Sequence, residues 1–375
     1  MEIKEINCHL LSSPIRGAKI HGQSQGVKTI AIIEAKAEGF SGLGEAYVGI
    51  YIPELTSKIV NQISLSFIGK DVSESINLIK EFKAPFVSNA GIYKSILGAI
   101  EISLYDLKSK IDDIPLYKCF SEEACLPKLY ASGGSVITTP KDLDDDLSLA
   151  KSKQIESFKM RVGKQPWKED LERVNHVRSN NSDMCLMVDA ISGTRDPMWS
   201  LEESIEKFKS LEDFDLTWLE EPLSPERLDE HLLLKNSINI PLAAGEAYSS
   251  ETEFYGLIHS ANIDIVQFDV THSGGFSVAN KVHKLAALDN KKSAFHVWGS
   301  LVAQMANYHL ALSMKDLFYF EVPLLELELN DSLIKSEETI FDLVKKIPEE
   351  PGLGLHLNED TLNKYGYVPG TEYKW

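Results

Sequence analysis

Residues with the chemistry of acids, bases and metal ligands recur at the ends of short apolar runs between residues 156 and 323. In chain order, these runs are ESFKMRVG with Lys159 and Arg161, CLMVDA with Asp189, LTWLEEP with Glu220 and Glu221, IPLAAGEA with Glu246, DIVQFDV with Asp269, SAFHVWG with His296, and FYFEVP with Glu321. A single carboxylate in such a position is most often a surface or helix-capping acid. Its recurrence in successive runs favours a shared site.

Three of the carboxylates, Asp189, Glu220 and Glu246, form an all-oxygen ligand set of high negative charge. Such a set suits Mg²⁺ better than zinc, which prefers His or Cys ligands. Only one glutamate of LTWLEEP can join the set, because neighbouring residues of a strand point to opposite sides. The three carboxylates therefore predict a magnesium site.

His296 and Asp269 end consecutive runs. An aspartate that accepts the proton of one ring nitrogen fixes the histidine tautomer and makes the other nitrogen more basic. A lone histidine in such a run is more often a core residue, so the prediction of a general base depends on the pairing.

Lys159 and Arg161 place two positive charges at alternate positions of one strand, so both side chains point to the same face. On an edge strand that face would be solvated, which is the simplest interpretation of the pair taken alone. In a central strand the cations need anions opposite them. The predicted metal ligands supply these anions and favour a central strand.

Eight apolar runs, beginning with KLYASGG at residues 128–134, alternate with amphipathic stretches. Each repeat takes roughly 20 to 30 residues, the length of a strand followed by a helix, and eight such units close into a (β/α)₈ barrel. Active-site residues of such barrels lie at the C-terminal strand ends, so the residues above should converge on one pocket. We expect the barrel to span residues 126–325.

The flanking segments have a different pattern. Residues 1–125 begin with strand-like runs and continue with helical ones, which predicts an α+β domain. A Gly-rich polar loop over residues 13–26 is too long for a hairpin turn and is typical of a lid. Residues 326–375 are too many for a tail, and we expect them to pack back on the N-terminal domain.

Composition limits the classes of partner. The chain has 375 residues, 43% of them hydrophobic, and a formal net charge of −18, which disfavours nucleic acid and anionic membranes. A small anionic substrate would need a local positive site. No apolar segment long enough to span a membrane and no secretory leader is indicated, and the four cysteines have no paired spacing. We therefore expect a cytoplasmic protein. We also expect a homo-oligomer.

These motifs resemble the enolase superfamily, and within it the mandelate racemase subgroup. The resemblance rests on KMR, VDA, WLEEP, the GE of AAGEA, QFDVTHSGG, HVWG, FEVP and PGLG, and it covers nearly the whole chain. It implies a modified barrel with an N-terminal capping domain, and Mg²⁺ held by Asp189, Glu220 and Glu246. It also implies His296 with Asp269 on one substrate face, Lys159 with Arg161 on the other, and Glu321 hydrogen-bonded to the enolate oxygen. The expected substrate-binding residues of the capping loops and the barrel mouth are His21, Tyr47, Tyr51 and Trp298.

Two positions depart from the family pattern. The common VDAN has Ile191 in its last position, and the common K-x-K has Arg161 in place of the second lysine, the usual second base. A guanidinium with its pKa above 12 is a poor proton acceptor. We therefore expect a one-base reaction, the Mg²⁺-dependent dehydration of an acid sugar or related hydroxy acid. The alternatives are a racemase or epimerase, a lactone cycloisomerase, and a metal-binding barrel without catalysis.

Overall fold

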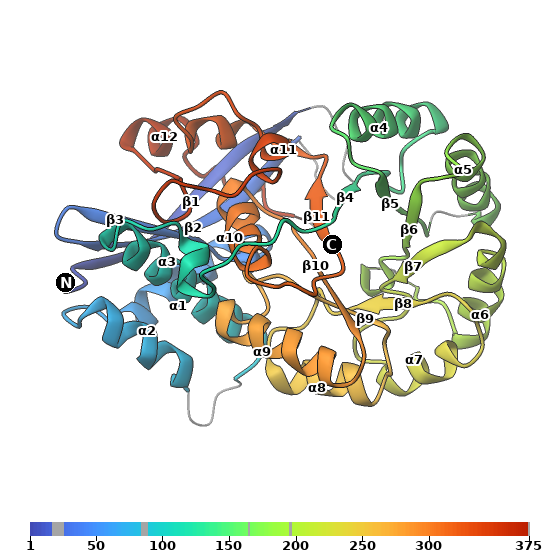
Figure 1. Cartoon of the computed structure of the whole chain (residues 1–375), viewed down its shortest axis with the longest axis horizontal. Coiled ribbons are helices and arrows are strands. Elements are labelled where there is room, and N and C mark those ends of the chain that lie inside the picture. The colour runs from blue at the N-terminus through green and yellow to red at the C-terminus, as the bar shows by residue number, and fades with distance from the viewer. Residues whose placement is uncertain (17–25, 84–88, 164–165, 195–196, 374–375) are drawn as a thin grey trace.

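The computed structural model describes residues 1–16, 26–83, 89–163, 166–194 and 197–373, and its two sheets lie side by side (Figure 1). One is a four-stranded antiparallel sheet in the order β12-β1-β2-β3, and the other is an eight-stranded parallel sheet in the order β10-β9-β8-β7-β6-β5-β4-β11. Within the described ranges, every helix is too short or too polar to cross a lipid bilayer.

The parallel sheet closes into a barrel. Its strands are β4 (Leu129–Ser132), β5 (Ser157–Arg161), β6 (Cys185–Asp189), β7 (Leu216–Glu220), β8 (Leu242–Ala244), β9 (Ile265–Phe268), β10 (Lys292–Phe295) and β11 (Phe320–Pro323). The backbone N–H of Phe295 donates to the carbonyl of Tyr319 at 3.0 Å, and that of Phe318 donates to Ser293 at 2.9 Å. These bonds join the first and last strands of the sheet, so all eight predicted strands and the predicted barrel are confirmed.

Helices cover the outside of the barrel. They are α4 (Pro140–Ser152), α5 (Trp167–Asn180), α6 (Leu201–Lys209), α7 (Leu228–Lys235), α8 (Glu251–His259), α9 (Gly275–Leu288) and α10 (Leu301–Ala311). Each follows one of the first seven strands. The eighth strand, β11, departs from this repeat because the chain continues directly into β12 (Glu326–Leu327), which belongs to the other sheet.

The antiparallel sheet forms the capping domain. Its strands β1 (Glu5–Arg16), β2 (Val27–Ala37) and β3 (Phe40–Glu45) pack with α1 (Pro53–Ser64), α2 (Val72–Glu81) and α3 (Gly91–Ile111) around a separate apolar core. Helix α3 approaches β3 closely at Gly42 and Gly44, where an added Cβ would lie 2.2 Å from backbone atoms of α3. Glycine is therefore required at both positions.

One local prediction for this domain was wrong in detail. The first strand continues to Arg16 because its end pairs with β12, so residues 13–16 of the expected loop belong to a strand. Residues Tyr47–Ile50 form a short 3₁₀ helix, η1. His21 lies outside the described residues.

Residues after β12 contact the capping domain. After β12 come the 3₁₀ helix η5 (Glu328–Ser332) and the helices α11 (Ile340–Leu343) and α12 (Glu359–Lys364). Beyond them, the Tyr373 N–H donates to the carbonyl of Ile50 at 2.9 Å. Tyr373 therefore lies against η1, while the division into domains at residues 125 and 325 stays a prediction.

Candidate active site

Strand alternation places the charged residues at the barrel mouth. The interior of the barrel is filled by a buried cluster that includes Met187 and Trp218. Asp189 and Glu220 come two residues later on the same strands and therefore point to the same inward face. On β9, Ile265 and Gln267 likewise point to the inward face, and Asp269, directly after the strand, continues this alternation. The convergence predicted from the sequence is thus built by one layer of apolar side chains beneath one layer of charged ones.

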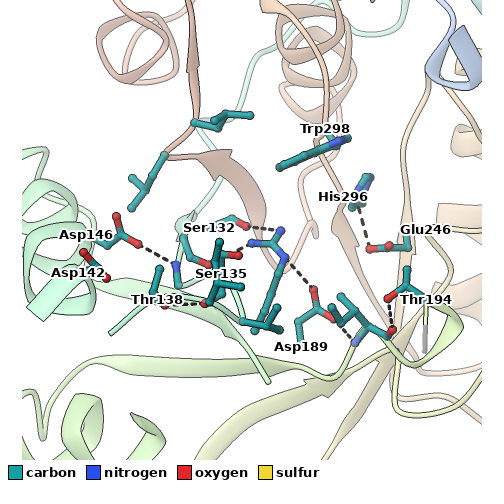
Figure 2. A pocket seen from close by; sticks show the side chains of 18 of the residues that line it. Ser132, Ser135, Thr138, Asp142, Asp146, Asp189, Thr194, Glu246, His296 and Trp298 are labelled. Atoms are coloured by element: carbon teal, nitrogen blue, oxygen red, sulfur yellow. Dashed lines mark hydrogen bonds and ion pairs between the residues drawn. The ribbon is translucent and has the colours of Figure 1, made fainter. Parts of the chain in front are cut away.

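Each of the three predicted metal ligands is paired with a basic group. Glu220 forms an ion pair with Lys159, Asp189 Oδ2 lies 3.5 Å from Arg161 Nε, and Glu246 Oε2 lies 3.5 Å from His296 Nε2. Figure 2 shows the Asp189 and Glu246 pairs at the pocket. Among the described residues, no three His, Cys, Asp or Glu side chains are grouped closely enough to hold a metal ion in this arrangement.

Glu220 is held deepest of the three carboxylates. Its Oε2 accepts hydrogen bonds from Trp218 Nε1 at 2.9 Å and Gln267 Nε2 at 2.8 Å, and its side chain is fully buried. The neighbouring Glu221 instead accepts a bond from the Gly245 N–H at 2.9 Å. The first glutamate of LTWLEEP is thus the one that points into the barrel.

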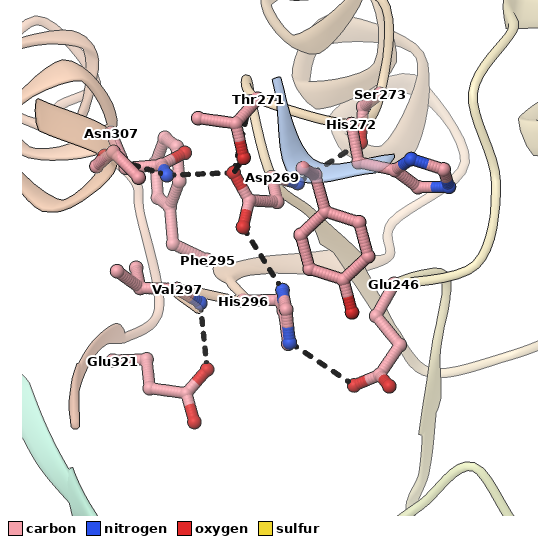
Figure 3. A network of polar contacts seen from close by, with 12 residues as sticks. Glu246, Asp269, Thr271, His272, Ser273, Phe295, His296, Val297, Asn307 and Glu321 are labelled. Atoms are coloured by element: carbon pink, nitrogen blue, oxygen red, sulfur yellow. Dashed lines mark hydrogen bonds and ion pairs between the residues drawn. The ribbon is translucent and has the colours of Figure 1, made fainter. Parts of the chain in front are cut away.

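His296 and Asp269 are in direct contact, with 3.1 Å between Nδ1 and Oδ2 (Figure 3). The other oxygen of Asp269 accepts hydrogen bonds from the Thr271 hydroxyl at 2.7 Å and from Asn307 at 2.8 Å, which fixes the carboxylate. Burial acts to lower the pKa of His296, but the charges of Glu246 and Asp269 outweigh it and raise that pKa to about 9. The contact fits a basic, oriented imidazole.

Lys159 and Glu321 form a second buried pair, with 2.9 Å between Nζ and Oε1. The other oxygen of Glu321 accepts a hydrogen bond from the Val297 N–H at 2.8 Å. Burial acts to raise the pKa of Glu321, yet the neighbouring Lys159 ammonium lowers it to about 2. Burial likewise opposes the charge on Lys159, but the Glu220 and Glu321 carboxylates raise its pKa above the ordinary value.

Arg161 is anchored at the edge of the pocket. Its Nη1 donates to the Gly133 carbonyl at 3.1 Å and its Nη2 to the Ser132 hydroxyl at 3.3 Å. Although burial disfavours its charge, Asp189 and other carboxylates raise the pKa of the guanidinium above its usual range. Arg161 therefore stays a cation and a hydrogen-bond donor.

Four of these groups line one cavity of about 440 Å³, while Lys159, Glu220, Asp269 and Glu321 are not among its lining residues. Arg161, Asp189, Glu246 and His296 share it with three predicted substrate-binding residues, Tyr47, Tyr51 and Trp298. The hydroxyls of Tyr47 and Tyr51 are 3.2 Å apart, and the Tyr47 ring stands edge-on to His296 at 5.9 Å. The capping domain thus contributes directly to the cavity wall.

Several residues at or near this site were not predicted from the sequence. Tyr373 lines the cavity and packs against Tyr51 with ring centroids 5.4 Å apart. Lys28 is fully buried, has no hydrogen-bond partner among the described residues, and lies 3.9 Å from the Trp298 ring centroid. The end of β4, the loop that follows it and the first turns of α4 supply a further wall, with Ser132, Ser135, Thr138, Asp142, Asp145 and Asp146. The available signal for Lys28 was a basic residue shortly before the apolar run IAII of β2.

Ile191 also lines the cavity, and its backbone is unusual. Its φ is 40°, in the left-handed region, and its N–H donates to Asp189 Oδ1 at 2.8 Å. Asparagine tolerates this region far better than a β-branched residue does. The departure from VDAN therefore places a strained apolar residue beside the predicted metal ligand.

A closed parallel barrel with an oriented histidine and clustered carboxylates at its mouth defines a barrel enzyme. Residues 144–361 match the family described as enolase C-terminal domain-like. Since this match covers more than half of the chain, the protein belongs to that family and to the enolase superfamily.

Known relatives catalyse several reactions. The L-talarate/galactarate dehydratase of Salmonella typhimurium is 28% identical over 93% of this chain and 86% of that protein. The arabinonate dehydratase of Saccharolobus solfataricus is 24% identical over 88% of each protein. The crystal structure of the 3,6-anhydro-D-galactonate cycloisomerase from Zobellia galactanivorans has a TM-score of 0.82 and 25% identity, covering 97% of this chain and 99% of that chain.

Proposed function

We propose that this enzyme uses Mg²⁺ to remove the proton α to a carboxylate and thereby dehydrates an acid sugar. The observation that carries the proposal is the contact between His296 and Asp269 at a cavity that Asp189, Glu246 and Arg161 also line. The dehydratases among the relatives support the same reaction class.

The donor chemistry fits Mg²⁺. Asp189, Glu220 and Glu246 present only carboxylate oxygens at the ends of three adjacent strands or just beyond them, and hard divalent cations prefer such ligands. These residues would hold the ion. When bound, it stabilises negative charge on the substrate carboxylate as the α-proton leaves. The basic partners of these carboxylates, Lys159, Arg161 and His296, would then be available to interact with the substrate.

His296 is the proposed base. Its Nδ1 faces Asp269, so Nε2 is the nitrogen that takes the α-proton. The resulting imidazolium returns the proton to the β-hydroxyl, the C–O bond breaks, and water leaves. The enol product then tautomerises to a 2-keto-3-deoxy acid. Lys159 and Glu321 are the remaining groups that we propose stabilise charge during the reaction.

Arg161 favours the one-base reaction over racemisation. Racemisation needs an acid and a base on opposite substrate faces, and Arg161 occupies the position of the usual second base. Its contacts to Gly133, Ser132 and Asp189 are those of a fixed donor. Racemase or epimerase chemistry therefore ranks below dehydration. Cycloisomerisation is the second candidate, since a crystallographic relative is a cycloisomerase and one base suffices for it.

A non-catalytic barrel is disfavoured because the base, its aspartate and all three carboxylates are present. Incubation with a library of acid sugars, with Mg²⁺ and with chelator, tests the proposal by formation of 2-keto-3-deoxy product. Product that depends on Mg²⁺ and on His296 supports it. The absence of product from every acid sugar, with deuterium exchange also absent, overturns it. The expected homo-oligomer stays a prediction, and light scattering would test it.

A further inference from the structure

We infer that Glu45 is a positioning residue, which keeps His296 and Asp269 in contact by fixing the start of helix α10. Glu45 ends strand β3 of the capping domain, and it is not among the residues that line the cavity. The inference rests on the proposed function, because it assigns to Glu45 the orientation of the proposed base. It gives the capping domain a part in the reaction beyond its contribution to the cavity wall.

Glu45 binds the segment in which the chain enters α10 after β10. The residue is 1% exposed. Its Oε2 accepts hydrogen bonds from the Ser300 N–H at 3.1 Å, from the Ala303 N–H at 3.3 Å and from the Ser300 hydroxyl. The fit is close, because a Cβ added at Gly299 would lie 2.6 Å from Glu45 Oε1. The carboxylate therefore holds both the N-cap residue of α10, Ser300, and a residue of its first turn.

These bonds supply acceptors that the start of a helix needs. The first N–H groups of a helix have no intrahelical partner, and the N-cap side chain commonly accepts the N–H of the third helical residue. Helices α4, α6 and α8 follow this rule with Thr139, Ser200 and Ser250. In α10 the third residue is Ala303, and its N–H donates to Glu45, while Ser300 accepts from Val302 at 3.2 Å. A strand of the other sheet thus provides the acceptor at this helix start.

Helix α10 is connected to both members of the His296–Asp269 pair. His296 lies four residues before the N-cap of the helix. On the helix itself, the side chain of Asn307 donates to Asp269 Oδ1 at 2.8 Å, as Figure 3 shows, and to the carbonyl of Ala303 at 3.0 Å. A shift of the start of α10 would therefore move the segment that carries His296 and the amide that fixes Asp269. Their contact of 3.1 Å would be lost or lengthened.

Glu45→Gln is the variant that tests this role. It keeps the size of the side chain but replaces one carboxylate oxygen by an NH₂ group, which cannot accept a hydrogen bond. The groups of Ser300 and Ala303 that face Glu45 are donors, so the anchor is weakened. We expect kcat to fall about tenfold or more, because the base is displaced, while KM changes less than about twofold, because the residues that line the cavity are retained.

A second readout does not depend on turnover. The Nδ1 proton of His296, bonded to Asp269, should give a downfield proton resonance that is identified by its loss in His296→Asn. We expect this resonance to shift or disappear in Glu45→Gln. The matched control is Glu203→Gln, because Glu203 likewise accepts the N–H of an N-cap serine, Ser200 of α6, at 2.8 Å. The control should keep both kcat and the resonance.

The outcomes separate this inference from the proposed function. Unchanged kcat, a change confined to KM, or an unshifted resonance in Glu45→Gln overturns the positioning role. An equal loss of kcat in Glu203→Gln also overturns it, because any weakened helix start would then suffice. If the wild type dehydrates no acid sugar, the proposed function fails and the resonance alone decides. Its shift in Glu45→Gln but not in Glu203→Gln then supports the positioning role.

A shorter carboxylate provides a second variant at the same position. Glu45→Asp keeps the negative charge but withdraws it by one methylene group, and circular dichroism shows whether each variant is folded. If Glu45→Gln does not fold, Glu45→Asp takes its place with the same two readouts. We expect a smaller fall in kcat and a shifted resonance, and wild-type values of both in the folded Glu45→Asp protein overturn the positioning role.

Discussion

Lys159 and Glu220 form an ion pair in which both side chains are fully buried inside the barrel. Lys159 also forms an ion pair with Glu321, and Glu220 also accepts hydrogen bonds from Trp218 and Gln267. A buried charge that loses its partner has no solvent to replace it. The network therefore couples the stability of the barrel to groups that the proposed reaction uses.

We predict that Lys159→Met abolishes activity and lowers the free energy of unfolding by about 3–5 kcal/mol, because it leaves buried carboxylates unpaired. The double variant Lys159→Met/Glu220→Gln should regain part of this stability without regaining activity. Urea unfolding of both single variants and the double variant measures the coupling. Strict additivity of the two losses would contradict the pairing.

The barrel and its charged layer could be predicted because one physical rule generates both. Alternation along a strand places Asp189 above Met187 and Glu220 above Trp218, and this period is visible in the sequence. The contribution of Tyr373 could not be foreseen, because it depends on the return of the chain end to η1. Pairing of β1 with β12 is equally non-local, and it explains why the first strand continues past its predicted end.

The backbone at Ile191 leads to a second prediction. Because its φ of 40° suits asparagine better than a β-branched residue, Ile191→Asn should raise the free energy of unfolding by about 1 kcal/mol. Ile191→Val is the matched control, since valine is also β-branched and should bring no gain. Chemical unfolding of the wild type and the two variants measures this difference in stability. Equal stability of all three would show that the conformation of residue 191 carries no such strain.

Lys28 leads to a prediction of pH dependence. Burial lowers its pKa to about 7 from an ordinary value of 10.5, although Glu45 and Asp269 act in the opposite direction and Arg161 adds to the lowering. Between these values the unfolded chain binds the proton that the folded chain has released. The contribution of Lys28 to stability therefore improves as pH rises from about 7 toward 10.5.

Lys28→Met removes this contribution. Relative to the wild type, the variant should be most favoured near pH 7, and its advantage should shrink by up to about 1.4 kcal/mol per pH unit up to pH 9.5. Urea unfolding at several pH values measures the difference. Lys58→Met, at an exposed lysine of α1, is the control and should show no such trend. A constant difference between Lys28→Met and the wild type would contradict the shifted pKa.

Glu246 tests the proposed metal site with a readout other than turnover. Its side chain is 25% exposed, the most accessible of the three carboxylates, so substitution should leave the fold intact. Glu246→Gln removes one anionic ligand and should weaken Mg²⁺ binding at least tenfold in a calorimetric titration. Glu251→Gln, on the surface of α8, is the control. Unchanged affinity in Glu246→Gln would remove that residue from the site.

The last prediction separates dehydration by one base from racemisation by two. If His296 is the sole base, His296→Asn should abolish exchange of the substrate α-proton with D₂O, because no other group at the cavity would form the enolate. Arg161→Lys should retain exchange through His296. It should also introduce slow exchange from the opposite face, since the pKa of a lysine, unlike that of an arginine, can be lowered by burial and neighbouring cations.

Proton NMR of the substrate follows this exchange directly, with Asp269→Asn as a variant that keeps the imidazole but loses its anionic partner. The opposite pattern is equally informative. Exchange at the wild-type rate in His296→Asn, together with its loss in Lys159→Met, would mean that the proton leaves toward β5. In that case the one-base mechanism is wrong, and a racemase or cycloisomerase becomes the better account of the groups around Arg161.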